Sequence, residues 1–204
     1  MSSAWPYIIH RAHAVGMPVH TEPWHIHIIG ERGKDRRAGR WDDFIHIARV
    51  DEAGNWQFRK LEATVDPGAY YSETGHLMNR RGVARMVSPQ YVEGYFEPGP
   101  HGKAKYRALR QVEPAWFWRE DDGDHIHGND PTTTRERGVI YANLHAASTR
   151  PYDVDVAPEF VGRWSAACQV VRRTPDFRLL MSWVDEHIRA GHSRRIDYTL
   201  VDAV

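Results

Sequence analysis

Apolar residues along most of this chain alternate with polar ones or form short runs, and turn residues bound the runs closely. A period of two is typical of β-strands that bury one face. The pattern predicts strands within 24–30, 42–51, 56–65, 83–99, 106–121, 138–148 and 195–204. In the first of them, Trp24, Ile26 and Ile28 fall on one face. His25 and His27 fall on the other.

One segment, residues 174–191, has helical periodicity. Its apolar positions recur every three or four residues and are Phe177, Leu180, Met181, Val184 and Ile188. Thr174 is expected as the N-cap, with Pro175 at the first helical position and Gly191 closing the helix. The pattern as a whole predicts a mainly β fold, β-rich α+β, with one major helix near the C-terminus.

Length and composition favour one domain spanning residues 1–204. The polar stretch 120–138 is expected to be a long loop that separates a β-rich part from the segment 138–204. Lys plus Arg equals Asp plus Glu, 27 each, so no overall field favours nucleic acid. No apolar stretch reaches spanning length, which argues against membrane insertion. The N-terminal residues do not resemble a secretion signal, so we expect synthesis in the cytoplasm.

The single cysteine, Cys168, excludes an intrachain disulfide and raises the question of catalysis. A thiol becomes a strong nucleophile when a nearby group removes its proton. His145 ends one predicted strand and Cys168 begins another, so the two meet if these strands are neighbours in one sheet. Residues 149–161 would then form a loop over the site. The alternative is a buried structural thiol.

Small residues precede this cysteine in the sequence Ser165-Ala166-Ala167-Cys168. They would let a substrate backbone approach, and the N–H groups of Ala167 and Cys168 could face an oxyanion in a tight turn. Ser165 would orient the ligand or the turn itself.

The stretch from His145 to Gly191 resembles the catalytic segment of the L,D-transpeptidase (YkuD-like) family. That family carries a histidine on one strand, a variable loop, and then Ser-His-Gly-Cys, followed by a helix and a final strand. Here His145 and Cys168 match the histidine and the cysteine, whereas Ala166 and Ala167 replace the second histidine and the glycine. The segments ATVDPGAYY and GYFEPGPHGKAKYRAL also resemble strands of the family. The departures suggest a divergent phage or prophage branch.

The resemblance implies a fold of mixed sheets, or a β-sandwich, and a cysteine enzyme acting on peptide stems of peptidoglycan or its precursor. Cys168 would form a thioester, and His145 would act as the base. Water as acceptor makes the enzyme a peptidase or carboxypeptidase, and an amine makes it a transpeptidase. Arg163 and Trp164 would bind substrate, with Arg163 pairing with a stem carboxylate unless it is simply solvated. Such an enzyme needs no cofactor, and an endolysin would reach the wall through lysis or in a virion.

Two other functions remain open from the sequence. The pairs His25–His27 and His125–His127 have a spacing that places both rings on one face of a strand, so they could hold Zn²⁺ in a hydrolase. Alternating histidines also occur simply on half-exposed sheet faces. The third possibility is a non-catalytic phage structural or binding module on the same fold, with the aromatic residues of 91–118 as its recognition surface. Those aromatic residues are equally suited to a sheet core.

Overall fold

The computed structural model describes residues 5–35, 37–72, 78–102, 105–120 and 134–204. In these residues the chain is mainly β, as the hydrophobic pattern predicts. The elements, in chain order, are α1 (Tyr7–Ala14), β1 (His27–Arg32), β2 (Asp43–Val50), β3 (Trp56–Thr64), α2 (Ala69–Ser72), β4 (Val83–Met86), β5 (Gln90–His101), β6 (Tyr106–Gln111), β7 (Ala115–Glu120), β8 (Thr134–Gly138), β9 (Leu144–Ala146), β10 (Gln169–Val171), α3 (Thr174–Arg189) and β11 (Ile196–Asp202).

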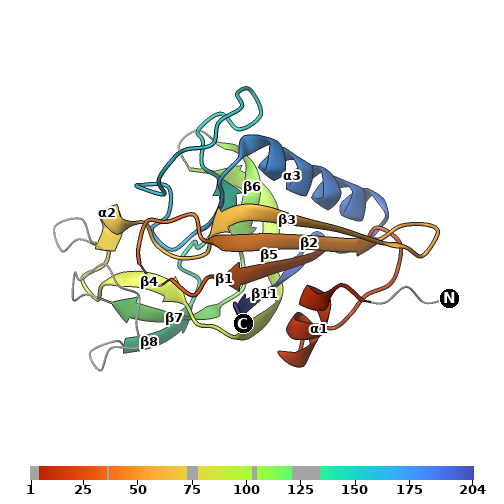
Figure 1. The fold of residues 1–204 in the computed structure, drawn as a ribbon, viewed down its shortest axis with the longest axis horizontal. Helices are drawn as coiled ribbons and strands as arrows, with labels where there is room; N and C mark the ends of the chain where they lie inside the picture. The colour runs from red at the N-terminus through yellow and green to blue at the C-terminus, as the bar shows by residue number, and fades with distance from the viewer. Residues whose placement is uncertain (1–4, 36, 73–77, 103–104, 121–133) are drawn as a thin grey trace.

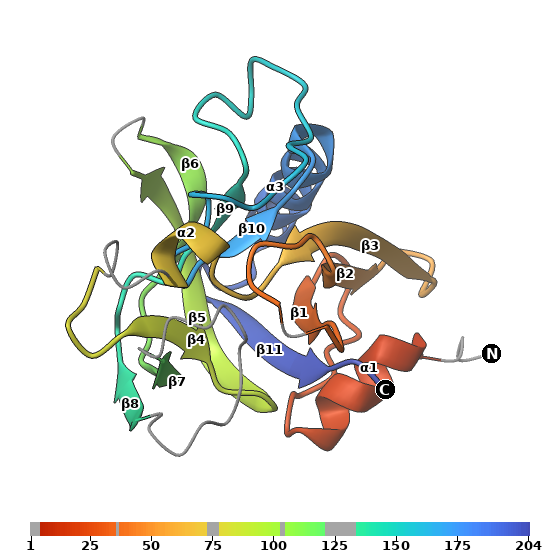
Figure 2. The ribbon, with the colours of Figure 1, turned by 60° about the vertical axis from the view of Figure 1, so that its left-hand side comes forward.

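Eight of these strands close into a barrel in the order β1-β11-β5-β6-β9-β10-β3-β2 (Figure 1). Two neighbouring pairs are parallel, β1 with β11 and β9 with β10, and the other six are antiparallel. A second sheet, β4-β7-β8, lies beside the barrel (Figure 2). The closed barrel differs from the expected sandwich: β1 pairs with both β2 and β11, so the sheet meets itself and leaves no free edge there.

The main core fills the barrel and extends beneath α3 and the smaller sheet. Tyr95, Phe96 and Tyr198 are fully buried in this core and contact one another. The rings of Tyr95 and Tyr198 stack, and each meets the ring of Phe96 edge to face. The apolar face of α3 contributes Phe177, Leu180, Met181, Trp183 and Val184 to the same core. Most aromatic rings of the 91–118 region are therefore core or half-buried, although Trp116 is 41% exposed.

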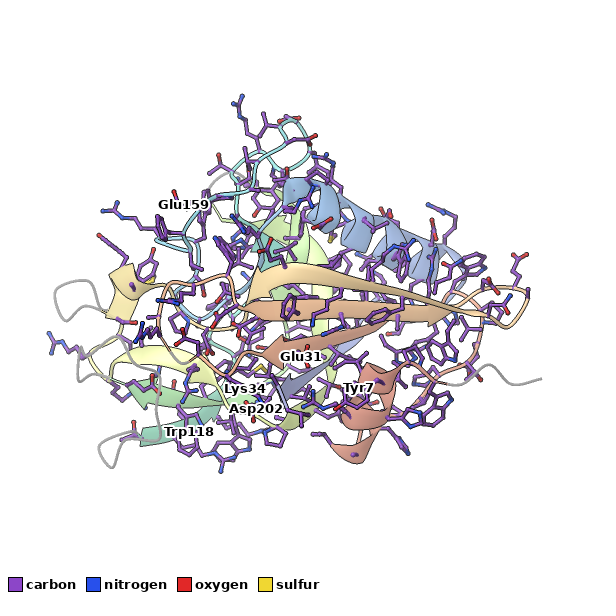
Figure 3. The ribbon with its side chains drawn as sticks, viewed as in Figure 1. Tyr7, Glu31, Lys34, Trp118, Glu159 and Asp202 are labelled. Atoms are coloured by element: carbon purple, nitrogen blue, oxygen red, sulfur yellow. The ribbon has the colours of Figure 1, made fainter. Side chains whose placement is uncertain are left out.

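A second, smaller core forms outside the barrel beneath α1. Ile8, Ile9 and Ala12 of this helix pack against Ile29 and Val201, which face away from the barrel interior. Figure 3 shows Tyr7 on α1 and Asp202 at the end of β11 on the same side of the molecule. The sequence pattern did not predict this helix, because eight residues are too few to establish a helical period.

Several predicted element boundaries are wrong. Strand β1 starts at His27, because Trp24 adopts a left-handed backbone conformation with φ +67° that interrupts an extended strand. The strand expected at 138–148 shrinks to β9. Residues 134–138, expected in a long loop, instead form β8 and pair with β7. The rest of that predicted loop lies outside the described residues.

The start of α3 also differs from its prediction. Arg173 is the N-cap and makes no side-chain cap, while Thr174 is the first helical residue and Pro175 follows it. The Thr174 hydroxyl donates to the carbonyl of Val154 (2.7 Å) and accepts from the N–H of Val156 (3.0 Å), so it ties a loop to the helix. Gly191 closes the helix with φ +90°, as expected. Across the described residues, no helix has the length and apolar character needed to traverse a bilayer.

Candidate functional site

The candidate site forms where β9 and β10 run side by side. Val170 pairs with His145, and Gln169 pairs with Leu144, in a parallel register that brings Cys168 beside the end of β9. The two strands are short, yet β6 and β3 flank them on either side within the closed barrel. The sequence predicts that His145 and Cys168 meet if their strands are neighbours in one sheet. Strands β9 and β10 are neighbours, Cys168 directly precedes β10, and both residues line one cavity of about 840 Å³.

Cys168 is half-buried at the wall of this cavity. Its Sγ lies 3.7 Å from the carbonyl oxygen of Tyr141, a residue held at φ +64°. Burial raises the pKa of the Cys168 thiol to about 11, while the backbone N–H of Asn143 acts in the opposite direction. The resting residue is therefore a neutral thiol at neutral pH.

His145 is buried, with 4% of its surface exposed, and its ring orientation is fixed by the backbone. Its Nδ1 lies 2.9 Å from the carbonyl oxygen of Ala146. A carbonyl only accepts hydrogen bonds, so Nδ1 carries the proton and Nε2 holds a lone pair. Burial, and then the neighbouring ring of His101, lower the pKa of His145 to about 3, and the carbonyls of Ala146 and Trp164 oppose this effect. The ring is a neutral base with a chosen tautomer.

The turn before Cys168 is held from within and from a distant segment. Ser165 is fully buried, and its hydroxyl donates to the carbonyl of Cys168 (2.8 Å). The carbonyl of Ser165 accepts from the N–H of Gly68 (2.8 Å). Ser165 thus orients the turn, which is one of the two roles predicted for it. No hydrogen bond to a described residue occupies the backbone N–H of Ala167 or Cys168, so both donors remain available.

The predicted substrate-binding residues also line the cavity. The guanidinium of Arg163 lies over the ring of Tyr70, 4.0 Å from its centroid, and Trp164 follows it along the wall. Within the described part of the chain, Arg163 has no carboxylate partner. Arg119, another cavity residue, is already paired with Glu136. Arg163 is therefore a cation held in place with its charge uncompensated by those residues.

His101 is part of the site, and the sequence reasoning missed it. It comes from β5 and stacks on His145, with ring centroids 4.1 Å apart. Its Nδ1 lies 3.2 Å from the side-chain nitrogen of Asn143, which fixes the second ring in turn. Only β6 separates β5 from β9 in the sheet. This arrangement is non-local, so no local signal in the sequence could have indicated the contact.

The loop expected over the site lies mostly elsewhere. Of residues 149–161, Thr149 lines the cavity, whereas the chain around Val154 and Val156 is bound to Thr174 of α3. The cavity wall is instead completed by residues 163–168. This part of the prediction was wrong, because the buried Thr174 hydroxyl holds the loop on the helix.

One of the two predicted zinc pairs, His25 and His27, lies within the described residues. His125 and His127 lie outside the described residues. His25 and His27 have ring centroids 5.6 Å apart, but Nε2 of His27 is engaged with the carbonyl of His20 at 2.9 Å. Neither His25 nor His27 lines the cavity of Cys168.

Comparisons of the chain with protein-family models, with curated proteins and with solved structures find no match in any of the three. Function is therefore inferred from the residues of the site.

Proposed function

We propose that this protein is a cysteine-dependent acyl-transfer enzyme that acts on the peptide part of peptidoglycan, in the manner of an L,D-transpeptidase. One observation carries the proposal: His145 lies on β9, Cys168 directly precedes the adjacent parallel strand β10, and both residues line the same cavity. A reactive thiol, a base of defined tautomer and two available N–H donors are the components that acyl transfer requires.

In the proposed reaction, Nε2 of His145 accepts the thiol proton as Sγ of Cys168 attacks an amide carbonyl carbon. The developing oxyanion is stabilised by the N–H groups of Ala167 and Cys168. When the C–N bond breaks, the leaving amine takes the proton from His145, and a thioester remains on Cys168. Water then yields a carboxylic acid, or a second amine yields a new amide. The acceptor gives its proton to His145 as it attacks, and His145 passes this proton to the Cys168 thiolate when the C–S bond breaks.

The hydrogen bond from His145 to the Ala146 carbonyl supports the role of the base. The carbonyls of Ala146 and Trp164 both favour the protonated ring, so they stabilise the imidazolium that forms transiently. His101 packs against one face of the ring and keeps it from turning. We assign His101 as a positioning residue.

The cavity supports a peptide substrate that carries a carboxylate. Its volume of about 840 Å³ suits a few amino-acid residues, and Arg163 offers a cation held against Tyr70. A guanidinium binds a carboxylate through two parallel hydrogen bonds. The free carboxylates of a peptidoglycan stem are ligands of this kind.

The proposal is tested with purified sacculi and soluble muropeptides, with products identified by mass spectrometry. Cys168→Ala should reduce turnover by at least about 10³-fold while leaving the thermal unfolding curve unchanged. Ser182→Ala is the matched control, because its hydroxyl lies on the exposed side of α3 and donates locally to Leu179. Full turnover in Cys168→Ala would contradict the proposal.

A non-catalytic binding module is the second candidate, and Ala166 and Ala167 favour it because they replace residues of the family's motif. That reading predicts equal binding of muropeptides by the wild-type protein and Cys168→Ala, with no product from either. Product formation by the wild-type protein alone separates the two candidates.

A further inference from the structure

Five histidines, His20, His25, His27, His187 and His192, cluster beside a second cavity. His20, His25 and His187 line this cavity, which shares no lining residue with that of Cys168. The cavity measures about 500 Å³. His25 is at the centre of the group: its ring stacks on His20 (centroids 3.9 Å apart) and touches His187 and His192 (4.9 Å each). His187 and His192 also stack on each other at 4.8 Å. Burying several imidazoles together removes them from water, and each ring then needs a hydrogen-bond partner or a metal ion to compensate for the lost hydration.

Hydrogen bonds to backbone carbonyls determine which nitrogen holds the lone pair in two of these rings. Nε2 of His192 lies 2.8 Å from the carbonyl of Pro23, and Nε2 of His187 lies 2.9 Å from that of Ser193. Both Nε2 atoms therefore carry the proton, and both Nδ1 atoms hold a lone pair. A ring N–H donated to a backbone carbonyl is the arrangement that typically orients a metal-ligating histidine.

We propose that His25, His187 and His192 form a binding site for Zn²⁺ or a similar borderline transition metal. One ring nitrogen from each of the three lies within 4.8 Å of the others. Nitrogens around a tetrahedral Zn²⁺ are about 3.4 Å apart, so the rings need to draw inward by up to about 1.4 Å. The cavity leaves the fourth position to water or a ligand.

The surroundings favour a cation. Glu93, Glu113 and Asp197 line the same cavity, while Arg195 is its one cationic residue of fixed charge among the described lining residues. Arg195 is itself paired with Glu113.

One existing contact limits the affinity. Nδ1 of His187 accepts a long hydrogen bond, 3.2 Å, from the N–H of Ile26. A metal at this nitrogen displaces that donor, so we expect a micromolar dissociation constant, weaker than that of a closed structural zinc site. The strained Trp24, at φ +67°, precedes His25 and turns the chain into the cluster; strain of this kind is often found at functional sites.

The probe is Zn²⁺ alone, added to the metal-free full chain and measured by competition with a chromophoric chelator. Saturating Zn²⁺ should also raise the melting temperature by about 5 °C. His192→Gln and His25→Gln should each lower the affinity by at least about tenfold and remove the thermal shift. His10→Gln is the matched control, because His10 is exposed on α1 and away from the cluster.

Unchanged Zn²⁺ affinity in both His192→Gln and His25→Gln would overturn the proposal. The proposal would also be overturned if Glu22→Gln abolished Zn²⁺ binding while His192→Gln left it unchanged. That result would place the metal at His20, Glu22 and His25, the other ligand group in this region. Because binding is measured without substrate, the result is independent of whether Cys168 is catalytic.

Discussion

At the scale of single residues, the site rests as a neutral pair. The pKa of Cys168 is raised to about 11 and that of His145 is lowered to about 3, in each case chiefly by burial. A thiolate–imidazolium pair needs the opposite order of pKa values. The proposed reaction therefore requires the proton to move from Cys168 to His145 during attack on the substrate.

This protonation state predicts slow alkylation of Cys168 by iodoacetamide at neutral pH. At pH 7 a thiol with a pKa of about 11 is ionised to about one part in 10⁴, so the rate should rise about tenfold per pH unit up to pH 10. The readout is unambiguous because the chain has one cysteine. The same thiol in the urea-unfolded chain should react faster at pH 7. A plateau below pH 8 in the folded protein would contradict the prediction.

The residues of the site differ in how far the sequence could reveal them. That Cys168 and His145 border one cavity could be expected, because each stands beside a strand that the sequence pattern predicts. Ser165 was predictable as an orienting residue, since its partner is three positions away. His101 was not, because its contact with His145 joins β5 to β9, on either side of β6, and the spacing of residues along the chain gives no signal of it.

At the scale of elements, the site depends on the contact between two turns. The turn that ends in Cys168 is hydrogen-bonded to Gly68, which lies just before α2. A Cβ at Gly68 would lie 2.1 Å from the carbonyl oxygen of Gly162, well inside contact distance. The close approach of the two backbones therefore requires glycine at position 68.

We accordingly predict that Gly68→Ala destabilises the protein by about 1–3 kcal/mol and lowers turnover by displacing the turn around Ser165. Urea unfolding gives the first quantity, and muropeptide turnover gives the second. Gly138→Ala is the control, since a Cβ there meets nothing within 4 Å. Equal stability and turnover in the two variants would show that the turn tolerates the displacement.

The elements themselves were mostly predictable where the pattern is long. Strands β2, β3 and β11 and helix α3 lie close to their expected bounds, because each carries several periods of one repeat. The short elements α1 and β9 were missed or misplaced. Their residues are fixed by tertiary contacts, Ile8 and Ile9 against β1 and β11, and Val170 against His145.

At the scale of the whole molecule, the protein is expected to lose stability in mild acid. The pKa values of His25, His145 and His187 are lowered to about 2, 3 and 4, mainly by burial. Histidine in the unfolded chain keeps a value near 6.5. The unfolded state therefore binds more protons below pH 6.5, and stability, full above this pH, falls as the pH drops toward 4.

His145 sets the size of this loss because it is buried. On its own it should lower the free energy of unfolding by about 2 kcal/mol between pH 6.5 and pH 5. Burial and nearby Asp66 raise the pKa of Asp43, so the folded protein takes up as much as one proton there that the unfolded chain does not. This uptake partly offsets the loss of stability caused by the histidines. Urea unfolding at pH 7, 6 and 5, in the presence of a chelator, should show net proton uptake on unfolding. His145→Gln should flatten the slope, whereas His10→Gln should not. A free energy of unfolding independent of pH would refute the expectation.

The position of β11 has a consequence for how the protein matures on the ribosome. This strand is inserted between β1 and β5, so two strands of the N-terminal half wait for residues 196–202 before the barrel can close. At about 5–20 residues per second, synthesis of the chain takes roughly 10–40 s. During that time the edges of β1 and β5 that pair with β11 have no strand partner. The nascent chain can then bind chaperones, or associate wrongly with other nascent chains on the same mRNA. Any activity at Cys168 begins only after the last strand has been released.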